Sequence, residues 1–469
     1  MLSIPISYVI TLFPILGTLF VASIDKNRLD NVKSVSLWIT FFTLVFSIIQ
    51  LFVPSFSKIV THDVITNFTN RLPVRYSADV DNFSILFVVL VSLVCFLSII
   101  WLWKREIQNI KSFFISLLLF EAFTIGAFYS IDMFLLFFCM EATLIPTYTM
   151  MLSWDGAKKT SYVLLYLAYG MFSALAILVA IIMIYLETKS SNLLEIYKIG
   201  IKNENIFWLL MIGIGAKMPI WPLCHWLPTA HTKTNVVCSV LLASIVLKFS
   251  TLILLRFIDP LFSEYLIRYR DIFVIASIVS ISLAVINIIF QDDIKRFFAY
   301  FSIIHMDLYF MIFLSGIDRS HFIFSTLQHG LMAIVMFFTA DIIENLFKTR
   351  SISDISSYNQ QYRGLRILLL FVSTSLIGIP CTSGFIAEIT SIYAITKSMG
   401  IILSVVVVLI IAVLSAYTIF VYNSIFSKNG GHPSGVSQAS ILCDRYQMTS
   451  LVIASIGIIF LGMLPALFS

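Results

Sequence analysis

The chain has 469 residues, of which 59% are hydrophobic and 12% are charged, with a formal net charge of +5 and a mean hydropathy of +0.98. This composition excludes a soluble protein of this size and indicates a polytopic membrane protein. The basic residues are spread over many short connections, which argues against nucleic acid as a partner. The six cysteines form no C-x-x-C pair, which argues against a metal cluster or a disulfide framework.

Apolar stretches long enough to cross about 30 Å of hydrocarbon recur along the whole chain. We count fourteen of them and therefore predict an all-α membrane protein with about 14 transmembrane helices in a single membrane domain. The first stretch has no basic segment before it, so we expect a mature span and not a cleavable signal. The stretches lie near residues 4–23, 34–54, 83–103, 112–131, 132–153, 161–186, 205–224, 236–257, 272–290, 296–314, 322–345, 364–396, 399–426 and 449–468.

Two of the predicted spans contain helix breakers. The seventh has Pro219 and Pro222 shortly after Lys217, and the twelfth has Gly378 and Pro380 before its acidic residue. Broken helices at matching positions in two halves indicate an inverted structural repeat with an ion pathway at the breaks. We predict two inverted five-helix repeats, an N-terminal group of three helices and a C-terminal helix, which occupy residues 112–257, 272–426, 1–111 and 449–468 respectively.

Ionisable residues inside the predicted hydrocarbon are costly, so each needs a reason to be there. One alternative for any of them is a buried ion pair or a polar contact between helices. As a set they favour proton transfer, because Glu, Lys and His can each take and release a proton when neighbours change. The set comprises Glu121, Glu141, Lys217, Lys248, His305, Asp307, His329 and Glu388.

Glu141 and Lys217 are the strongest candidate pair. If they approach each other, the pair can act as a switch that holds both charges when closed, although a permanent salt bridge is the alternative. Glu121 can equally face a neighbouring span and be structural. Asp307 lies two residues from His305 and hence on another face of the helix, so both cannot line one path equally well.

Other chemistry finds less support in the sequence. His225 and His231 lie in the proline-rich connection after Lys217, but six residues apart they share no helical face, and no further zinc ligand is nearby. The glycines of G-I-G-A-K lack the third glycine of a dinucleotide fingerprint, and no Walker A motif occurs. We therefore expect no metal, NADH or ATP site on this chain.

Several blocks of sequence resemble the antiporter-like, proton-pumping membrane subunits of respiratory complex I, in particular the branch formed by the fourth mitochondrial chain and bacterial subunit M. These blocks are FFCMEATLIPTY, AKMPIWPLCHWLPTAH, QDDIKRFFAYFSIIHM, LQHGLMAIVMFF and GIPCTSGFIAEI. They cover the region from about Phe113 to Phe426 in the expected order.

The resemblance implies proton translocation coupled to NADH:ubiquinone electron transfer by the whole complex. It implies that FMN, the iron-sulfur clusters and ubiquinone belong to other subunits, and that the partners are adjacent antiporter-like chains and membrane lipids. The proton-transfer residues carried over by motif are Glu141, Lys217, Lys248, His305, His329 and Glu388.

The chain departs from the family pattern in three places. WLPTAHTKTN replaces the usual W-L-P-D-A-H-x-E-A-P, Cys381 stands where glycine is common, and Asp307 stands where a small residue is usual. The 42 Phe residues against 18 Gly are common in AT-rich organellar genes. We therefore expect a divergent subunit of a mitochondrial inner membrane, with a bacterial plasma membrane as the alternative.

Two other functions stay open at this point. The chain can be a subunit of a related multi-subunit cation/proton antiporter or of a membrane-bound hydrogenase. It can also be a membrane scaffold in which the buried charges no longer carry protons. The altered connection around His231 keeps this hypothesis open.

Overall fold

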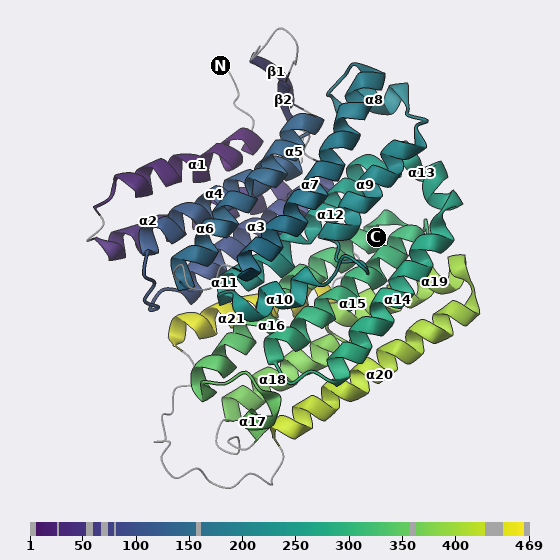
Figure 1. Cartoon of the computed structure of the whole chain (residues 1–469). Helices are drawn as coiled ribbons and strands as arrows, with labels where there is room; N and C mark the ends of the chain where they lie inside the picture. The colour runs from purple at the N-terminus through teal and green to yellow at the C-terminus, as the bar shows by residue number, and fades with distance from the viewer. Residues whose placement is uncertain are drawn as a thin grey trace. The chain divides into compact units, whose positions relative to one another are not determined.

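The computed structural model describes residues 6–25, 28–52, 60–66, 74–78, 81–155, 161–356, 363–426 and 444–463. Helices dominate these ranges, and eleven helical segments there are long and apolar enough to cross a membrane (Figure 1). Two of these segments, Met133–Ser153 and Val236–Arg268, consist of successive helical elements. The fold class is confirmed as all-α. A short antiparallel pair of strands, β1 (Val60–Thr66) and β2 (Val74–Ala78), lies in the connection between the second and third predicted spans and was not predicted.

The three remaining predicted spans are shorter or divided. The first forms α1 (Ile6–Ser23), an 18-residue helix that contains Pro14. The seventh ends at Lys217 and does not continue to residue 224, because the prolines that follow remove backbone donors. The twelfth consists of two helices separated by a break. The predicted broken helices seven and twelve are thus confirmed.

The chain forms two compact units. The first comprises Met1–Lys217 and Leu247–Arg268. Its helices are α1, α2 (Leu29–Phe52), α3 (Asn82–Trp101), α4 (Ile110–Tyr129), α5 (Met133–Ala142), α6 (Leu144–Asp155), α7 (Ser161–Thr188), α8 (Leu193–Ile199), α9 (Glu204–Lys217), α12 (Lys248–Ile253), the π-helical turn η4 (Leu254–Ile258) and α13 (Asp259–Arg268).

Local sequence explains where the helices around Glu141 begin and end. The Asp132 carboxylate caps α5 by accepting hydrogen bonds from the backbone N–H groups of Phe134 and Leu135, both at 3.0 Å. Pro146 cannot donate to the carbonyl of Ala142, and the helix is interrupted at Thr143 before α6 starts. Glu141 therefore lies in the last turn of α5, beside an irregular stretch of backbone.

The second unit comprises Met218–Val246 and Tyr269–Ser469. Its helices are α10 (Trp226–Lys233), α11 (Val236–Leu241), the π-helical turn η3 (Leu242–Val246), α14 (Arg270–Ile289), α15 (Ile294–Leu314), α16 (Arg319–Phe347), α17 (Ile352–Ser356), α18 (Arg363–Leu376), α19 (Ser383–Met399), α20 (Ile401–Ile425) and α21 (Arg445–Met463).

Helix α15 is the centre of this unit. It packs against α10, α14, α16 and α19, and nearly all of its side chains are buried. The Asp293 carboxylate caps its first turn through the backbone N–H groups of Lys295 (2.9 Å) and Arg296 (3.1 Å). A helix that is buried on every side can hold polar groups on several faces, and α15 does so.

The break before α19 contains two residues with positive φ, Gly378 and Cys381. Gly378 has φ +70°, a conformation that glycine adopts without steric cost, and α19 starts five residues later at Ser383. The boundaries of the compact units differ from those of the predicted repeats, since Met218–Val246 groups with the C-terminal part of the chain. The inverted relation between residues 112–257 and 272–426 stays a prediction.

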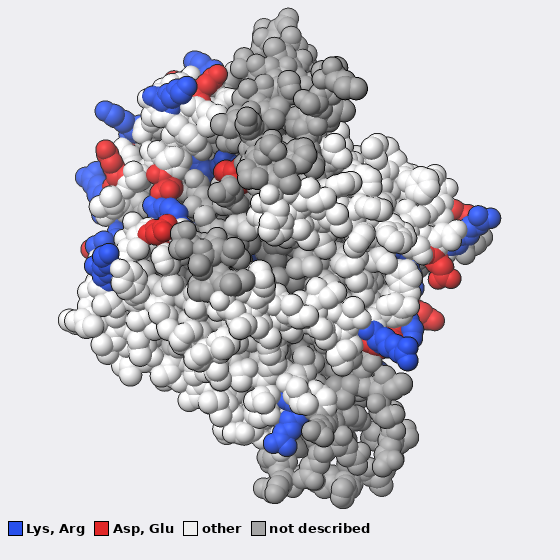
Figure 2. All heavy atoms as spheres, turned by 180° about the vertical axis from the view of Figure 1, so that it is seen from behind, with Lys and Arg blue, Asp and Glu red and all other residues white. Residues whose placement is uncertain are grey.

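Charged side chains are sparse on one face of the molecule. On the face in Figure 2, described Lys, Arg, Asp and Glu atoms form small separate groups, and a broad uncharged area lies between them. Large exposed apolar side chains such as Leu16, Trp38, Phe290 and Ile402 contribute to the described surface. A surface of this kind suits hydrocarbon or neighbouring membrane helices.

Candidate proton-transfer site

The first unit holds a buried acid–lysine pair. Lys217 is the last residue of α9 and Glu141 lies in the last turn of α5, and the Lys217 Nζ atom is 3.0 Å from the Glu141 Oε1 atom. Their side chains are only 7% and 13% exposed. The structure thus brings together the two residues that the sequence paired. Two opposite charges at this distance stabilise each other, and separating them leaves each without compensation.

Lys248 is the second lysine of this unit. It is fully buried and is the first residue of α12, which packs on α9. The chain just before it forms the π-helical turn η3, and the π-helical turn η4 follows α12. Such turns are rare and often occur at functional sites, because they shift the side chains that follow them around the helix axis.

Glu121 lies elsewhere in the first unit. It is fully buried on α4, within electrostatic range of Cys95 on α3. Neither of its carboxylate oxygens has a hydrogen-bond partner among the residues that the structure describes. No contact joins Glu121 to the Glu141–Lys217 pair in these described parts, so the structure does not add it to that pair.

In the second unit, His305 of α15 and His329 of α16 are neighbours. Their ring centroids lie 6.0 Å apart, with the rings perpendicular. Tyr309, one turn after His305, stacks on the His305 ring at 5.8 Å and donates a hydrogen bond of 2.9 Å to the Gln328 side-chain oxygen. The predicted histidines are thus brought together, and Tyr309 and Gln328 are polar neighbours that sequence reasoning missed.

Glu388 belongs to the same neighbourhood. It lies on α19, in the second turn after the break, and its carboxylate fills the space beside Gly378, where a Cβ atom would overlap it. The Tyr309 hydroxyl lies within electrostatic range of this carboxylate. His329, His305, Tyr309 and Glu388 therefore form a series of neighbouring titratable side chains on α16, α15 and α19.

Asp307 lies on a different face of α15, as the sequence indicated. It is fully buried, and its carboxyl interacts with the Ser280 hydroxyl of α14 and with the Cys224 thiol of the broken connection. No contact joins it to the His305–His329 pair among the described residues.

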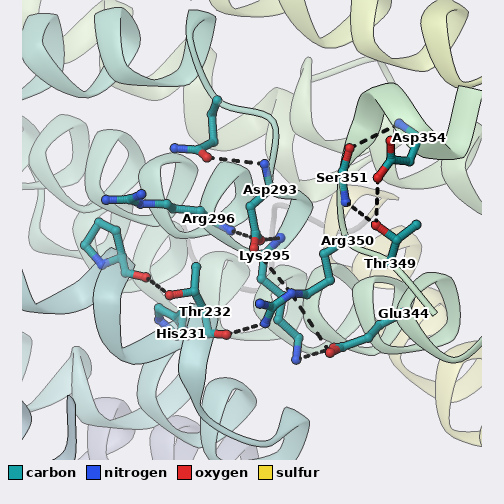
Figure 3. Close-up of polar contacts among 12 residues, drawn as sticks. His231, Thr232, Asp293, Lys295, Arg296, Glu344, Thr349, Arg350, Ser351 and Asp354 are labelled. Atoms are coloured by element: carbon teal, nitrogen blue, oxygen red, sulfur yellow. Dashed lines mark hydrogen bonds and ion pairs between the residues drawn. The ribbon is translucent and has the colours of Figure 1, made fainter. Parts of the chain in front are cut away.

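A loop-side polar cluster anchors the connection that departs from the family pattern (Figure 3). Arg350 donates a hydrogen bond to the backbone carbonyl of Thr232 and forms ion pairs with Asp293 at 3.3 Å and Glu344 at 3.9 Å. Glu344 also pairs with the buried Lys295 at 2.7 Å. These contacts tie α10 to the ends of α15 and α16.

The same connection is held at two further points. Asn235 caps α11 by accepting a hydrogen bond of 2.8 Å from the backbone N–H of Cys238. This asparagine stands where the family pattern has a proline. His231 is fully buried and stacks on Phe337 at 4.4 Å. The replaced residues therefore leave an ordered connection.

Hydrogen bonds also set the charge state of the loop beside this cluster. Burial alone would raise the pKa of the Asp292 carboxyl, but hydrogen bonds from the Ser351 hydroxyl and from the backbone and side chain of Ser353 lower its pKa overall.

No group of three or more His, Cys, Asp or Glu side chains in the described parts of the chain could hold a metal ion.

These features define a class: a polytopic helical membrane protein with broken spans and buried acid, lysine and histidine groups. Residues 130–415 match the family described as NADH:quinone oxidoreductase/Mrp antiporter, TM. The chain belongs to this family.

Relatives cover nearly the whole chain. NADH-quinone oxidoreductase subunit M of Rickettsia prowazekii is 27% identical over 99% of this chain and 96% of its own length. A chain of respiratory complex I from Thermus thermophilus has a similar fold, with a TM-score of 0.85 at 19% identity over 98% of this chain and 96% of that one. A chain of the Mrp complex from Dietzia sp. DQ12-45-1b reaches the same TM-score at 17% identity, over 99% and 96%.

Proposed function

We propose that this chain is a membrane subunit of respiratory complex I, of the chain 4 or subunit M type, which translocates protons across the membrane as the complex transfers electrons from NADH to quinone. The observation that carries the proposal is the buried Glu141–Lys217 pair at 3.0 Å, in a chain of this family. NADH oxidation and quinone reduction take place in other subunits, and this chain contributes the proton-carrying groups.

The pair works as a charge switch. While the two side chains are close, both stay charged, because each compensates the other in an apolar surrounding. When a change elsewhere in the complex draws Glu141 away, Lys217 is left as a lone buried cation and releases its proton. Lys248 of the same unit is the next group able to take it up.

The second unit supplies a different set of carriers. His305, His329 and Tyr309 can each gain or lose a proton without a lasting charge, and Glu388 closes the series at the second break. Its position beside Gly378 leaves the carboxylate next to the non-helical backbone of the break. Such interrupted backbone is tolerated where it lines a polar cavity.

The partners of this chain are other membrane subunits of the complex, notably adjacent antiporter-like chains, together with lipids. FMN, the iron-sulfur clusters and ubiquinone belong to other subunits of the complex, not to this chain. The membrane is the mitochondrial inner membrane or, for a bacterial source, the plasma membrane.

A cation/proton antiporter subunit is the second candidate, favoured by the fold shared with the Mrp chain. Purification of the chain with its native partners separates the two functions. A particle that contains flavin and iron-sulfur clusters and reduces quinone with NADH supports the first, and a particle without these groups that exchanges cations for protons supports the second.

The proposal is tested by NADH-driven proton pumping of the intact complex in sealed vesicles. We expect Lys217→Ala to reduce pumping strongly while the complex stays assembled, because the acid loses its charge partner. Lys295→Ala is the matched control: it also breaks an ion pair of a buried lysine, with Glu344, but at the loop end of α15.

An assembled Lys217→Ala complex that pumps as well as the wild type would overturn the proposed role. Equal losses in Lys217→Ala and Lys295→Ala would also count against it, since the effect would then follow from any broken ion pair.

A further inference from the structure

A cavity of about 380 Å³ lies in the second unit between the broken connection, α14 and α15. Its lining includes Trp221, Cys224 and His225 of the connection. A space of this volume far exceeds the roughly 10–15 Å³ that one buried water needs. It is lined in part by polar side chains, so water can fill it.

The cavity has an exposed mouth and a buried floor. Arg296 and Asn287, which line the mouth near the connection between α14 and α15, are exposed. Ser280 and Ile303, which line its inner part, are buried. The cavity therefore runs from the loop end of the two helices towards the middle of α15.

The helical spacing of the lining residues on α15 points to Asp307 as the next residue beyond the floor. On α15 the cavity is lined by Arg296, Tyr300 and Ile303, a series with spacings of four and three residues that defines one face of the helix. Asp307 is four residues after Ile303 and continues the same face. Two other groups that line the cavity, the Ser280 hydroxyl and the Cys224 thiol, are those that interact with its carboxyl.

The Ser280 hydroxyl is the one polar group of the described chain that interacts with this carboxyl as a hydrogen-bond donor. Within the described ranges, this interaction is too loose for full hydrogen-bond geometry at either Asp307 oxygen. That hydroxyl already accepts the backbone N–H of Trp221 at 3.2 Å and keeps its own proton free to donate. An ionised carboxylate with a single neutral donor is strongly disfavoured in an apolar interior, so this group needs water or a proton.

We propose that Asp307 is a proton-accepting site, connected with the loop side of the second unit through this water-filled cavity. One proton moves per event: an O–H bond to the Asp307 carboxylate forms as an O–H bond of a hydronium ion in the cavity breaks, and no electron is transferred. The site is separate from the His305–His329 pair on another face of α15. The inference rests on the proposed function and adds to it a separate proton-binding group in the second unit.

Thiol labelling of the intact complex tests the cavity. Cys224 lines it, whereas Cys238 of the same unit is fully buried on α11. We expect a small charged methanethiosulfonate to modify Cys224 several-fold faster than Cys238, as measured by peptide mass spectrometry. If Cys224 is as unreactive as Cys238, lipid or a neighbouring chain fills the cavity and the proposal is wrong.

Infrared spectroscopy of the same complex tests the carboxyl. We expect a carboxylic-acid C=O band that is absent in Asp307→Asn and shifts promptly on transfer to D2O. Ala284→Leu, which fills part of the cavity and keeps the carboxyl, should slow that shift several-fold. If the Ala284→Leu complex fails to assemble, the Asp307→Asn spectrum and the Cys224 labelling still test the proposal.

An Asp307 band that does not exchange, or no band lost in Asp307→Asn, would overturn the proposal. Neither measurement depends on proton pumping. The proposal for Asp307 can therefore fail in a complex in which Lys217→Ala still abolishes pumping. The reverse result, an exchanging Asp307 in a complex whose Lys217→Ala variant pumps normally, would reject the proposed function and leave the cavity site standing.

Discussion

In the first unit a buried acid and a buried lysine meet as an ion pair, whereas the series described in the second unit consists of two histidines, a tyrosine and Glu388. The first arrangement holds two full charges that depend on each other. The histidines and the tyrosine of the second can stay neutral and pass a proton on through small shifts. Substitutions should therefore act differently in the two units. In the first unit they should act mainly by removing a charge, and in the second mainly by displacing side chains from one another.

The largest effect is expected when one member of the Glu141–Lys217 ion pair is replaced and the other stays buried without its counter-charge. Lys217→Met leaves the Glu141 carboxylate buried without its counter-charge, which should cost about 3–5 kcal/mol. The double variant Glu141→Gln/Lys217→Met removes both charges and should recover most of that loss. Heat-induced dissociation of the purified complex measures both. If the double variant is as unstable as the single one, the pair does not act as a charge unit.

The next largest effect is expected from displacing the Glu388 side chain in the second unit. Gly378→Ala should displace Glu388, because a Cβ atom there would overlap its carboxylate. Gly316→Ala is the matched control, since Gly316 has nearly the same φ, +67° against +70°, and no atom within 4 Å of an added Cβ. Backbone strain should cost each variant about 1–3 kcal/mol. Only Gly378→Ala should also lower proton pumping, and equal pumping in the two would contradict the role of Glu388.

A smaller effect is expected at Tyr309. Tyr309→Phe keeps the ring stacked on His305 and removes the hydroxyl that donates to Gln328, which should cost about 0.5–1.5 kcal/mol and slow pumping. Tyr417→Phe serves as the control, because it also loses one hydrogen bond, to the Ile289 carbonyl at 2.9 Å, on an exposed part of α20. Slowed pumping in both variants, or in neither, would remove Tyr309 from the proton-carrying series.

The smallest effect concerns the loop-side polar cluster. Arg350→Ala loses the contacts to the Thr232 carbonyl, Asp293 and Glu344, but the guanidinium is about one-third exposed, so water replaces much of what is lost. We expect a loss of stability of about 1 kcal/mol or less, reduced further in high salt, with pumping per electron unchanged. A changed proton-to-electron ratio would show that this cluster takes part in the transfer.

Sequence alone predicted the features that local chemistry decides. Pro219 and Pro222 end α9, and Gly378 shapes the break before α19, because each acts on its own backbone. The fourteen apolar stretches were also visible, and each corresponds to one or more helical elements in the described ranges. The family resemblance rested on the same local blocks.

The rest required the folded chain. No breaker residue marks the π-helical turn over Leu242–Val246, so periodicity gave no sign of it. Tyr309 is one of 19 tyrosines, and its stacking on His305 and its hydrogen bond to Gln328 become visible only in the folded chain. The pairing of Glu141 with Lys217 was predicted from their residue types, but the distance between residues 76 positions apart is set by tertiary packing.

The most direct test of the account is the proton-to-electron ratio of the complex that carries Glu141→Gln/Lys217→Met. Both replacements are neutral and similar in size to the native side chains, so no lone charge is left to destabilise the unit. We predict an assembled complex that oxidises NADH but moves fewer protons for each electron pair than the wild type. An unchanged ratio in the assembled double variant would contradict the claim that these two residues carry protons.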